Sequence, residues 1–122
     1  MPIIEIQGMP HETDKEALRH LRSSLRQAVI GIGALELTDE KQVTLKFPSD
    51  LLDDDGGLQL IVTIKKLYAK KKRTSAVRQR VADTVGGIVK DFIRANTTNP
   101  KLLEVFVEEP YKATNGVFRF EF

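Results

Sequence analysis

Residues 2–7 read PIIEIQ, and this stretch decides the fold. Its β-branched side chains favour a strand, which Gly8 and Pro10 bring to an end. Thr13, followed by Glu16 in the pattern of a capping box, then predicts the start of a helix. Apolar residues continue at helical spacing, so one side of this helix faces a core. These residues are Leu18, Leu21, Leu25, Ala28, Val29 and Ile32.

The rest of the chain repeats the same order of strands and helix. Residues 42–47 alternate with period two and predict the strand that completes the first unit. Residues 58–68 and 102–109 predict a second pair of strands, and Thr74 or Ser75 caps a helix between them. The two predicted helices match at an offset of about 60 residues. The matched pairs are Leu21 with Val81, Leu25 with Val85, Ala28 with Ile88 and Ile32 with Phe92.

A duplicated βαβ unit predicts an α/β (α+β) fold in a single domain, residues 1–122, with pseudo-repeats 1–57 and 58–122. Its two helices cover one face of a four-stranded mixed sheet. The third predicted strand is apolar on both faces through Ile64, so we expect a homo-oligomer whose sheets face inward. A ferredoxin-like monomer with one sheet face in water has the same element order and is the alternative.

The composition narrows the classes of function. The 122 residues are 41% hydrophobic and 30% charged, which excludes disordered and fibrous proteins. The chain has no cysteine, which excludes disulfides and thiolate catalysis. His11 and His20 lie nine positions apart without clustered carboxylates, so no metal site is predicted. Because no apolar run is long enough to cross a bilayer and no signal-peptide pattern is present, we expect a cytoplasmic protein with no membrane partner.

Residues 65–73 form a basic stretch with six cations in nine positions. Such a run neutralises phosphates, and this would suit a nucleic-acid-binding ferredoxin-like module that uses Lys65 to Arg73. The other interpretation is a strand end and loop that lysines keep soluble and protect from stray strand pairing. An RNA-binding sheet needs aromatic residues in mid-strand, and residues 58–64 contain none, so nucleic acid is the less favoured partner.

The second residue offers a reactive nitrogen. Methionine is generally removed before a residue as small as proline, and its removal would leave Pro2 with a free secondary amine at the start of a strand. An unperturbed α-amino group has a pKa of about 7.7–8.0, and burial and nearby cations both lower it. The amine would then be largely unprotonated at neutral pH and able to move a proton between carbon and oxygen. A retained Met1 would block it.

The amino-terminal sequence Pro2-Ile3-Ile4-Glu5-Ile6 resembles that of the tautomerase superfamily, whose members begin with a catalytic proline and β-branched residues. The similarity extends over essentially the whole chain. Its length suits the fused branch with two βαβ units, which includes 5-carboxymethyl-2-hydroxymuconate isomerase and macrophage migration inhibitory factor. The resemblance implies a homotrimer with inward-facing sheets and a small-molecule carboxylate substrate. It also implies that no cofactor is required, because the proline supplies the reactive nitrogen.

The same resemblance implies roles for individual residues. Pro2 matches the catalytic proline, as general base and then acid. Short relatives bind a substrate carboxylate through Gly-Arg-Ser at a helix start; Lys72-Arg73-Thr74 is the match in the second unit, so Arg73 inherits that role. A second family arginine falls near Gln42, where Lys46 is the nearest cation. The predicted substrate-binding residues are Arg73, Lys46, Lys66, Gln42, Phe118 and Phe120, with the two phenylalanines as apolar walls.

The leading hypothesis is therefore an isomerase that tautomerises a small 2-keto or 2-hydroxy acid through Pro2. A non-catalytic oligomeric binding or structural protein on the same fold is the first alternative, since the first unit has His11-Glu12-Thr13 where the arginine motif is expected. The nucleic-acid-binding module is the second alternative.

Overall fold

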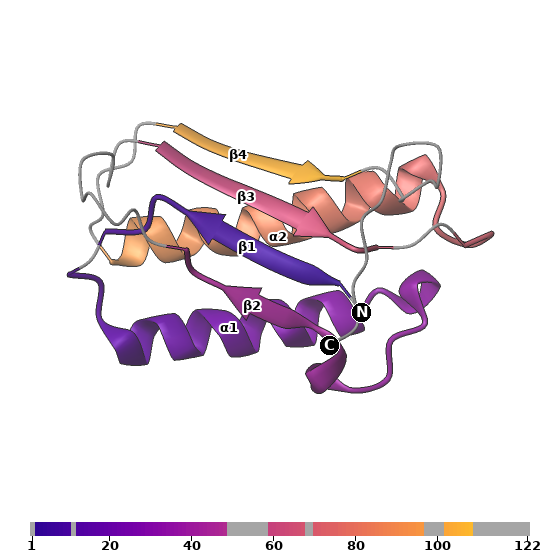
Figure 1. The fold of residues 1–122 in the computed structure, drawn as a ribbon, viewed down its shortest axis with the longest axis horizontal. Helices are drawn as coiled ribbons and strands as arrows, with labels where there is room; N and C mark the ends of the chain where they lie inside the picture. Colours follow the sequence, from indigo (N-terminus) through magenta and orange to yellow (C-terminus); the bar gives the residue numbers. More distant parts are fainter. Residues whose placement is uncertain (1, 11, 49–58, 68–69, 97–101, 109–122) are drawn as a thin grey trace, which may run out of the picture.

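The computed structural model describes residues 2–10, 12–48, 59–67, 70–96 and 102–108 (Figure 1). Within these ranges, strand, helix and strand follow one another twice, and two short 3-10 helices, η1 and η2, precede the second strand. None of the helices in these ranges combines the length and apolarity needed to cross a membrane. The elements are β1 (Ile3–Gln7), α1 (Lys15–Ile30), η1 (Gly33–Leu35), η2 (Glu40–Gln42), β2 (Thr44–Lys46), β3 (Gln59–Lys65), α2 (Ser75–Ala95) and β4 (Leu102–Val107).

The strands form one mixed sheet in the order β2-β1-β3-β4. β1 runs parallel to β2, with Ile3 beside Thr44, and β3 runs parallel to β4, with Gln59 beside Leu102. The two units meet where β1 and β3 pair in antiparallel register. The predicted tandem βαβ fold is therefore confirmed. A ferredoxin-like fold separates the two strands of each βαβ unit, whereas here they are adjacent, so that alternative is wrong.

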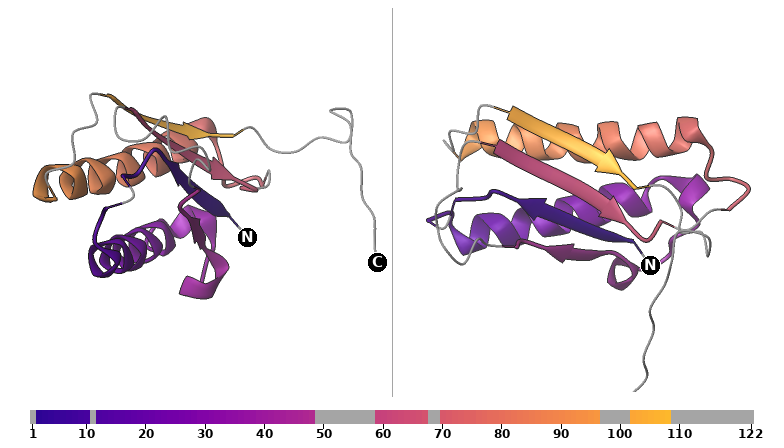
Figure 2. Two further views of the ribbon diagram at one scale, coloured as in Figure 1. Left: turned by 60° about the vertical axis from the view of Figure 1, so that its left-hand side comes forward. Right: turned by 45° about the horizontal axis from the view of Figure 1, so that its top comes forward.

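Both helices pack on the same face of the sheet, as the left panel of Figure 2 shows. Every second residue of β1 and β3 is buried on this face. The helix residues that match at the sequence offset are equivalent in the core, because Leu21, Leu25, Val81 and Val85 are each at most 3% exposed. Burial of a side chain of this kind contributes about 1.5–3 kcal/mol. The repeated apolar stripe thus holds each helix to its own half of the sheet.

The first helix begins one residue later than its capping-box pattern predicts. Asp14 is the N-cap, and its carboxylate accepts a hydrogen bond from the Ala17 N–H at 3.2 Å. Thr13 instead donates its hydroxyl to the Pro10 carbonyl at 2.7 Å. The prediction of Thr13 as the cap is wrong because an aspartate caps at least as well and also places a negative charge at the positive end of the helix dipole.

The second strand is shorter than its alternating pattern predicts. β2 covers only Thr44–Lys46, and Gln42 belongs to η2. The Gln42 amide oxygen accepts hydrogen bonds from the N–H groups of Thr38 and Asp39 at 2.7 and 3.0 Å. These bonds close the turn before the strand, and they keep Gln42 out of the sheet ladder.

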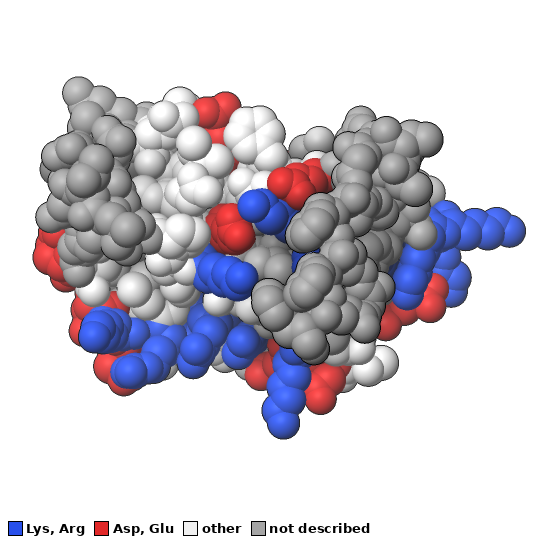
Figure 3. Space-filling view, viewed as in Figure 1, with Lys and Arg blue, Asp and Glu red and all other residues white. Residues whose placement is uncertain are grey.

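Among the described elements, none covers the opposite face of the sheet (Figures 2 and 3). On this open face β3 presents one large apolar residue, Ile61, so the prediction that this strand is apolar on both faces is wrong. Lys65 of the same strand lies 3.1 Å from the Glu5 carboxylate of β1. The exposed large apolar residues of the described part lie on this face of β4, where Leu102 and Phe106 are each 49% exposed.

Candidate active site

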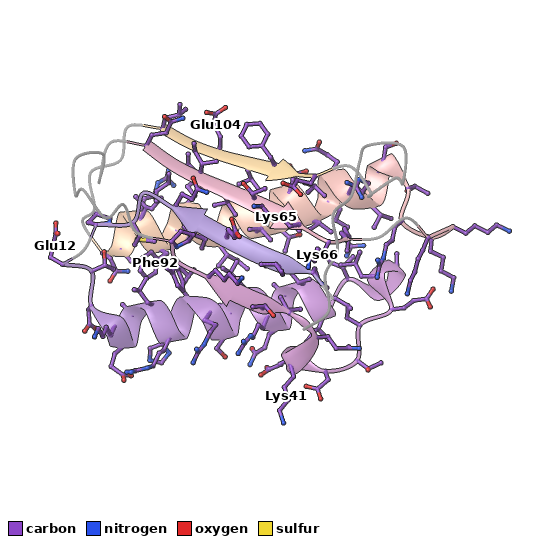
Figure 4. The ribbon with its side chains drawn as sticks, viewed as in Figure 1. Glu12, Lys41, Lys65, Lys66, Phe92 and Glu104 are labelled. Atoms are coloured by element: carbon purple, nitrogen blue, oxygen red, sulfur yellow. The ribbon has the colours of Figure 1, made fainter. Side chains whose placement is uncertain are left out.

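Pro2 lies at the amino end of β1, where the chain also leaves β3 and enters α2. It is buried, and its carbonyl accepts a hydrogen bond from the Thr44 N–H at 3.1 Å. Ile3 pairs with Lys65 at the end of the antiparallel β1–β3 ladder, so Pro2 and Lys66 are the next residues beyond the last pair on the two strands. Figure 4 shows Lys66 at this end of β1. Pro2 and Lys66 therefore lie at the same end of the sheet.

Lys66 adopts an unusual backbone conformation. Its φ is 57°, in the left-handed region that favours glycine. A lysine held there costs about 1 kcal/mol or more, and such strain tends to gather at functional sites. The conformation turns the chain out of β3 so that Lys66 is exposed while Leu67, the next residue, is only 2% exposed. The lysine side chain is thus left available at the Pro2 end of the sheet.

Arg73 precedes Thr74, whose hydroxyl caps α2, so the predicted start of the second helix is confirmed. Arg73 is half-buried, and its Nη2 donates to the Leu35 carbonyl at 3.0 Å. The neighbouring Lys72 ammonium lies 3.4 Å from the Glu36 carboxylate. These two contacts join the start of α2 to η1, and they fix where the Arg73 guanidinium lies.

The surroundings of Arg73 favour a bound anion. Removal from water lowers the pKa of Arg73; the Glu36 carboxylate opposes this shift, and the Arg78 guanidinium adds to it. An arginine guanidinium nevertheless stays protonated in proteins. A cation that is partly desolvated and lies near a second cation gains from an anionic partner, and a guanidinium can bind a carboxylate through two parallel N–H groups.

Arg78 is a residue of this region that the sequence analysis missed. Its guanidinium donates to the carbonyls of Leu67, at 3.5 Å, and of Glu108. The Glu108 N–H in turn donates to the Ile64 carbonyl at 3.0 Å, so Arg78 ties the ends of β3 and β4 together. One signal was present in the sequence. The helix dipole favours acidic residues near a helix start, so an arginine close to this start is unexpected.

Lys46 lies apart from this group within the chain. It is the last residue of β2, exposed, and opposite Glu5 in the sheet register. Two strand residues, about 7 Å, separate it from the end of the sheet that holds Pro2. The fold thus brings Pro2, Lys66 and Arg73 to one end of the sheet and leaves Lys46 nearer the middle of its edge.

The other predicted site residues are placed less directly. Gln42 lies at the same end as Pro2, but its amide oxygen is occupied by the capping box of η2. Its contact with a substrate stays a prediction. Phe118 and Phe120 lie outside the described residues. In the part of the chain that the structure describes, no three His, Asp or Glu side chains gather in a way that could hold a metal ion.

No protein-family model and no curated protein matches the chain. Solved structures do match. A probable enzyme from the thermophilic fungus Aspergillus fumigatus gives a TM-score of 0.62 at 20% sequence identity, over 90% of this chain and 76% of that one. A fused 4-OT, solved as an asymmetric trimer, gives a TM-score of 0.62 at 15% identity, over 88% of this chain and 85% of that one.

A 5-carboxymethyl-2-hydroxymuconate isomerase from Deinococcus radiodurans R1 gives a TM-score of 0.57 at 11% identity, over 98% of this chain and 88% of that one. It and the fused 4-OT are members of the tautomerase superfamily. At sequence identities this low, the matches are evidence of a shared fold only. They extend over most of each chain. The chain therefore has the fold of the tautomerase superfamily.

Proposed function

We propose that the protein is a tautomerase that interconverts the keto and enol forms of a small 2-keto or 2-hydroxy acid. The position of Pro2 supports this most, because the residue is buried at the start of β1, at the end of the sheet where Lys66 also lies. Removal of Met1 would give Pro2 a secondary amine. Burial and a neighbouring cation both disfavour its protonated form, so this amine would act as a base near neutral pH.

The proposed reaction moves one proton between two atoms of the substrate. In ketonisation the Pro2 nitrogen takes the proton from the enol oxygen. It then delivers this proton to the carbon of the double bond that does not bear the oxygen. Arg73 binds the substrate carboxylate, and Lys66 stabilises the negative charge that develops on the enolate oxygen. A positioned acid–base group contributes about 10²–10⁴-fold to the rate. No further reactive group is needed in this scheme.

We further propose a homotrimer in which the open sheet faces turn inward. Leu102 and Phe106 on this face expose apolar surface that a second protomer would bury. Two solved fused 4-OT structures of the same fold are described as trimers. In such an assembly Lys46, on the exposed edge strand, would serve the site of a neighbouring protomer. This placement reconciles its predicted role with its distance from Pro2 within one chain.

Phe106→Asp is expected to break this trimer. A carboxylate at a buried apolar contact is costly to desolvate, so light scattering should show the wild type at three times the 13.7 kDa chain mass and the variant at one. Ser24→Asp, at an exposed position of α1 on the helix side, is the matched control and should stay trimeric. A wild type that is monomeric, or a variant that stays trimeric, would refute the inward-facing arrangement.

Arg73→Gln is expected to raise KM for a 2-keto acid by about 10–100-fold. This is the loss of affinity expected when one hydrogen bond to a charged group is removed. Lys72→Gln is the control, because this neighbouring cation forms only an exposed pair with Glu36. Arg73 also bonds to the Leu35 carbonyl, so thermal unfolding of both variants should be compared with the wild type. An unchanged KM in folded Arg73→Gln would remove this residue from substrate binding.

A non-catalytic oligomer on the same fold is the second candidate. It is favoured by one observation: Gln42 and Arg73 both make hydrogen bonds within the chain, which would give each a structural role without any substrate. A protein of this kind would be trimeric but would not accelerate tautomerisation.

The two candidates are separated by following the ketonisation of phenylenolpyruvate and of 2-hydroxymuconate by absorbance. The protein used should be shown by intact mass to have lost Met1. A tautomerase should exceed the buffer rate with at least one of these enols. Rates equal to the buffer rate for both, in a processed trimer, would favour the non-catalytic oligomer.

A further inference from the structure

Four cations of α1 form a row that the proposed active site does not use. Lys15, Arg19, Arg22 and Arg26 are spaced by four, three and four residues, which places them on one face of the helix. At 1.5 Å per residue the row is about 16 Å long. Figure 3 shows it as a band of Lys and Arg side chains over α1. We call these four residues the α1 row.

Folding of the helix does not account for the α1 row, apart from Arg26, which bonds to the Val43 carbonyl. Its apolar stripe already attaches the helix to the sheet, and like charges three or four residues apart destabilise a helix. In the described ranges, the carboxylate that pairs with the row is Glu16, which contacts Arg19. The two side chains are 68% and 58% exposed, so this pair contributes little and is easily exchanged for another anion.

The α1 row borders a groove between α1 and the end of β2. The groove has a volume of about 180 Å³ and is lined by Lys15, Leu18, Arg19, Arg22 and Phe47, with no carboxylate among them. Leu18 and Phe47 are half-buried and pack against the core. Arg26 continues the row beyond the groove, and its Nε donates to the Val43 carbonyl at 2.9 Å. The groove thus has an apolar floor with an aromatic ring, and cations along its rim.

A cationic groove with an aromatic side chain is the combination that binds single-stranded nucleic acid, because cations follow the phosphates and bases stack on the ring. Three cations of the row are arginines, whose planar guanidinium matches a phosphate. The row is longer than the groove, so it suits an extended polyanion better than a compact ion. We propose that the α1 row and Phe47 form a binding surface for single-stranded nucleic acid.

This surface is distinct from the basic stretch at residues 65–73. In that stretch Lys65 pairs with Glu5, and Lys72 pairs with Glu36, so two of its cations already have carboxylate partners. Lys70 and Lys71 are exposed. Replacing both with glutamine provides a matched control, because it changes the net charge as much as a double substitution in the α1 row but at a different place. The proposal also stands apart from Pro2, and tautomerase assays of the same variants distinguish the two.

The test is fluorescence anisotropy with a labelled oligothymidylate of about 16 nucleotides, the upper end of known site sizes. Between about 50 and 200 mM salt the affinity should fall steeply as counterions are taken back up. Arg19→Gln combined with Arg22→Gln should weaken binding by roughly tenfold and flatten the logarithmic salt dependence by about 1.4. Phe47→Leu should weaken binding about fivefold or more, since leucine fills the site but offers no ring for stacking.

Competition with two other polyanions completes the test. Inorganic polyphosphate should bind wild type and Phe47→Leu equally, because it has no bases, and polyglutamate should compete weakly. The proposal is overturned if the oligonucleotide does not bind, or if Lys70→Gln with Lys71→Gln weakens it as much as the α1 variant does. It is also overturned if polyglutamate competes as well as the oligonucleotide, or if Phe47→Leu binds the oligonucleotide like the wild type while remaining folded by thermal unfolding.

Discussion

Pro2→Ala is expected to lower kcat/KM for the ketonisation of phenylenolpyruvate by about 10²–10⁴-fold, the contribution of a positioned acid–base group. Alanine is small enough that Met1 is still removed. The variant therefore changes the terminal amine without changing whether that amine is set free. The rigid secondary amine is replaced by a primary one, which is free to rotate and is no longer held at the start of β1. Steady-state kinetics on the two proteins measures the difference.

Pro48→Ala is the matched control for this change. Pro48 is exposed after β2, away from the start of β1, and its variant should keep the wild-type rate. A chain that carries one extra residue before Pro2 provides a second comparison, because an amide nitrogen is not a base, and its activity should fall as in Pro2→Ala. Equal rates in the wild type and in folded Pro2→Ala would remove Pro2 from the mechanism.

Gly8→Ala is expected to lower the free energy of unfolding by about 2–6 kcal/mol, from two causes of about 1–3 kcal/mol each. Gly8 has a φ of 92°, which side chains rarely tolerate. A Cβ at this position would also lie 2.1 Å from the Gln59 carbonyl oxygen, at the start of β3. The substitution therefore strains the turn and pushes apart the two central strands. Urea denaturation measures the loss.

Gly87→Ala is the control for Gly8→Ala and has the opposite expected sign. A Cβ at Gly87 would meet nothing within 4 Å, so alanine should stabilise the interior of α2 by about 0.5–1 kcal/mol. Gly86→Ala should fall between the two, because its Cβ would lie 3.3 Å from Val105 Cγ2. A Gly8→Ala protein as stable as the wild type would contradict the placement of Gly8 against β3.

The fold could be predicted from the sequence because its two halves carry the same pattern. Leu21 and Val81 occupy equivalent places in the core, as do Leu25 and Val85, and an offset between helices can be recognised without any structure. Period-two alternation predicted a strand at residues 42–47, of which β2 covers Thr44–Lys46. The relation between the halves was harder to predict. The element order alone does not show whether the two strands of a βαβ unit are adjacent or separated in the sheet. The pairing of β1 with both β2 and β3 shows that they are adjacent.

Two of the errors arose where a local contact competes with a pattern. Thr13 fits a capping box, but its hydroxyl is used by the Pro10 carbonyl and Asp14 takes the cap. Gln42 fits a strand, but its amide oxygen closes η2. In both cases a polar side chain bonds to nearby backbone, and sequence periodicity does not report such bonds.

The candidate site was predicted only in part. Pro2 and Arg73 were proposed from a position in the chain and a motif at a helix start, and both features are local in sequence. Arg78 was missed because its importance comes from two carbonyls, those of Leu67 and Glu108, which the fold brings to it from different strands. The strained backbone of Lys66 likewise has no sequence signature, since lysine is not a residue that favours a positive φ.

Covalent labelling with 2-oxo-3-pentynoate locates the reactive amine without knowledge of the natural substrate. The reagent has a carboxylate for Arg73 and a conjugated alkyne to which a secondary amine adds, forming a nitrogen–carbon bond as the nitrogen proton passes to the neighbouring carbon. Mass spectrometry of the processed chain should show one reagent mass added at Pro2, with tautomerase activity lost in parallel. Labelling of lysines alone, or full activity in chains labelled at Pro2, would contradict the role of Pro2 as the catalytic base.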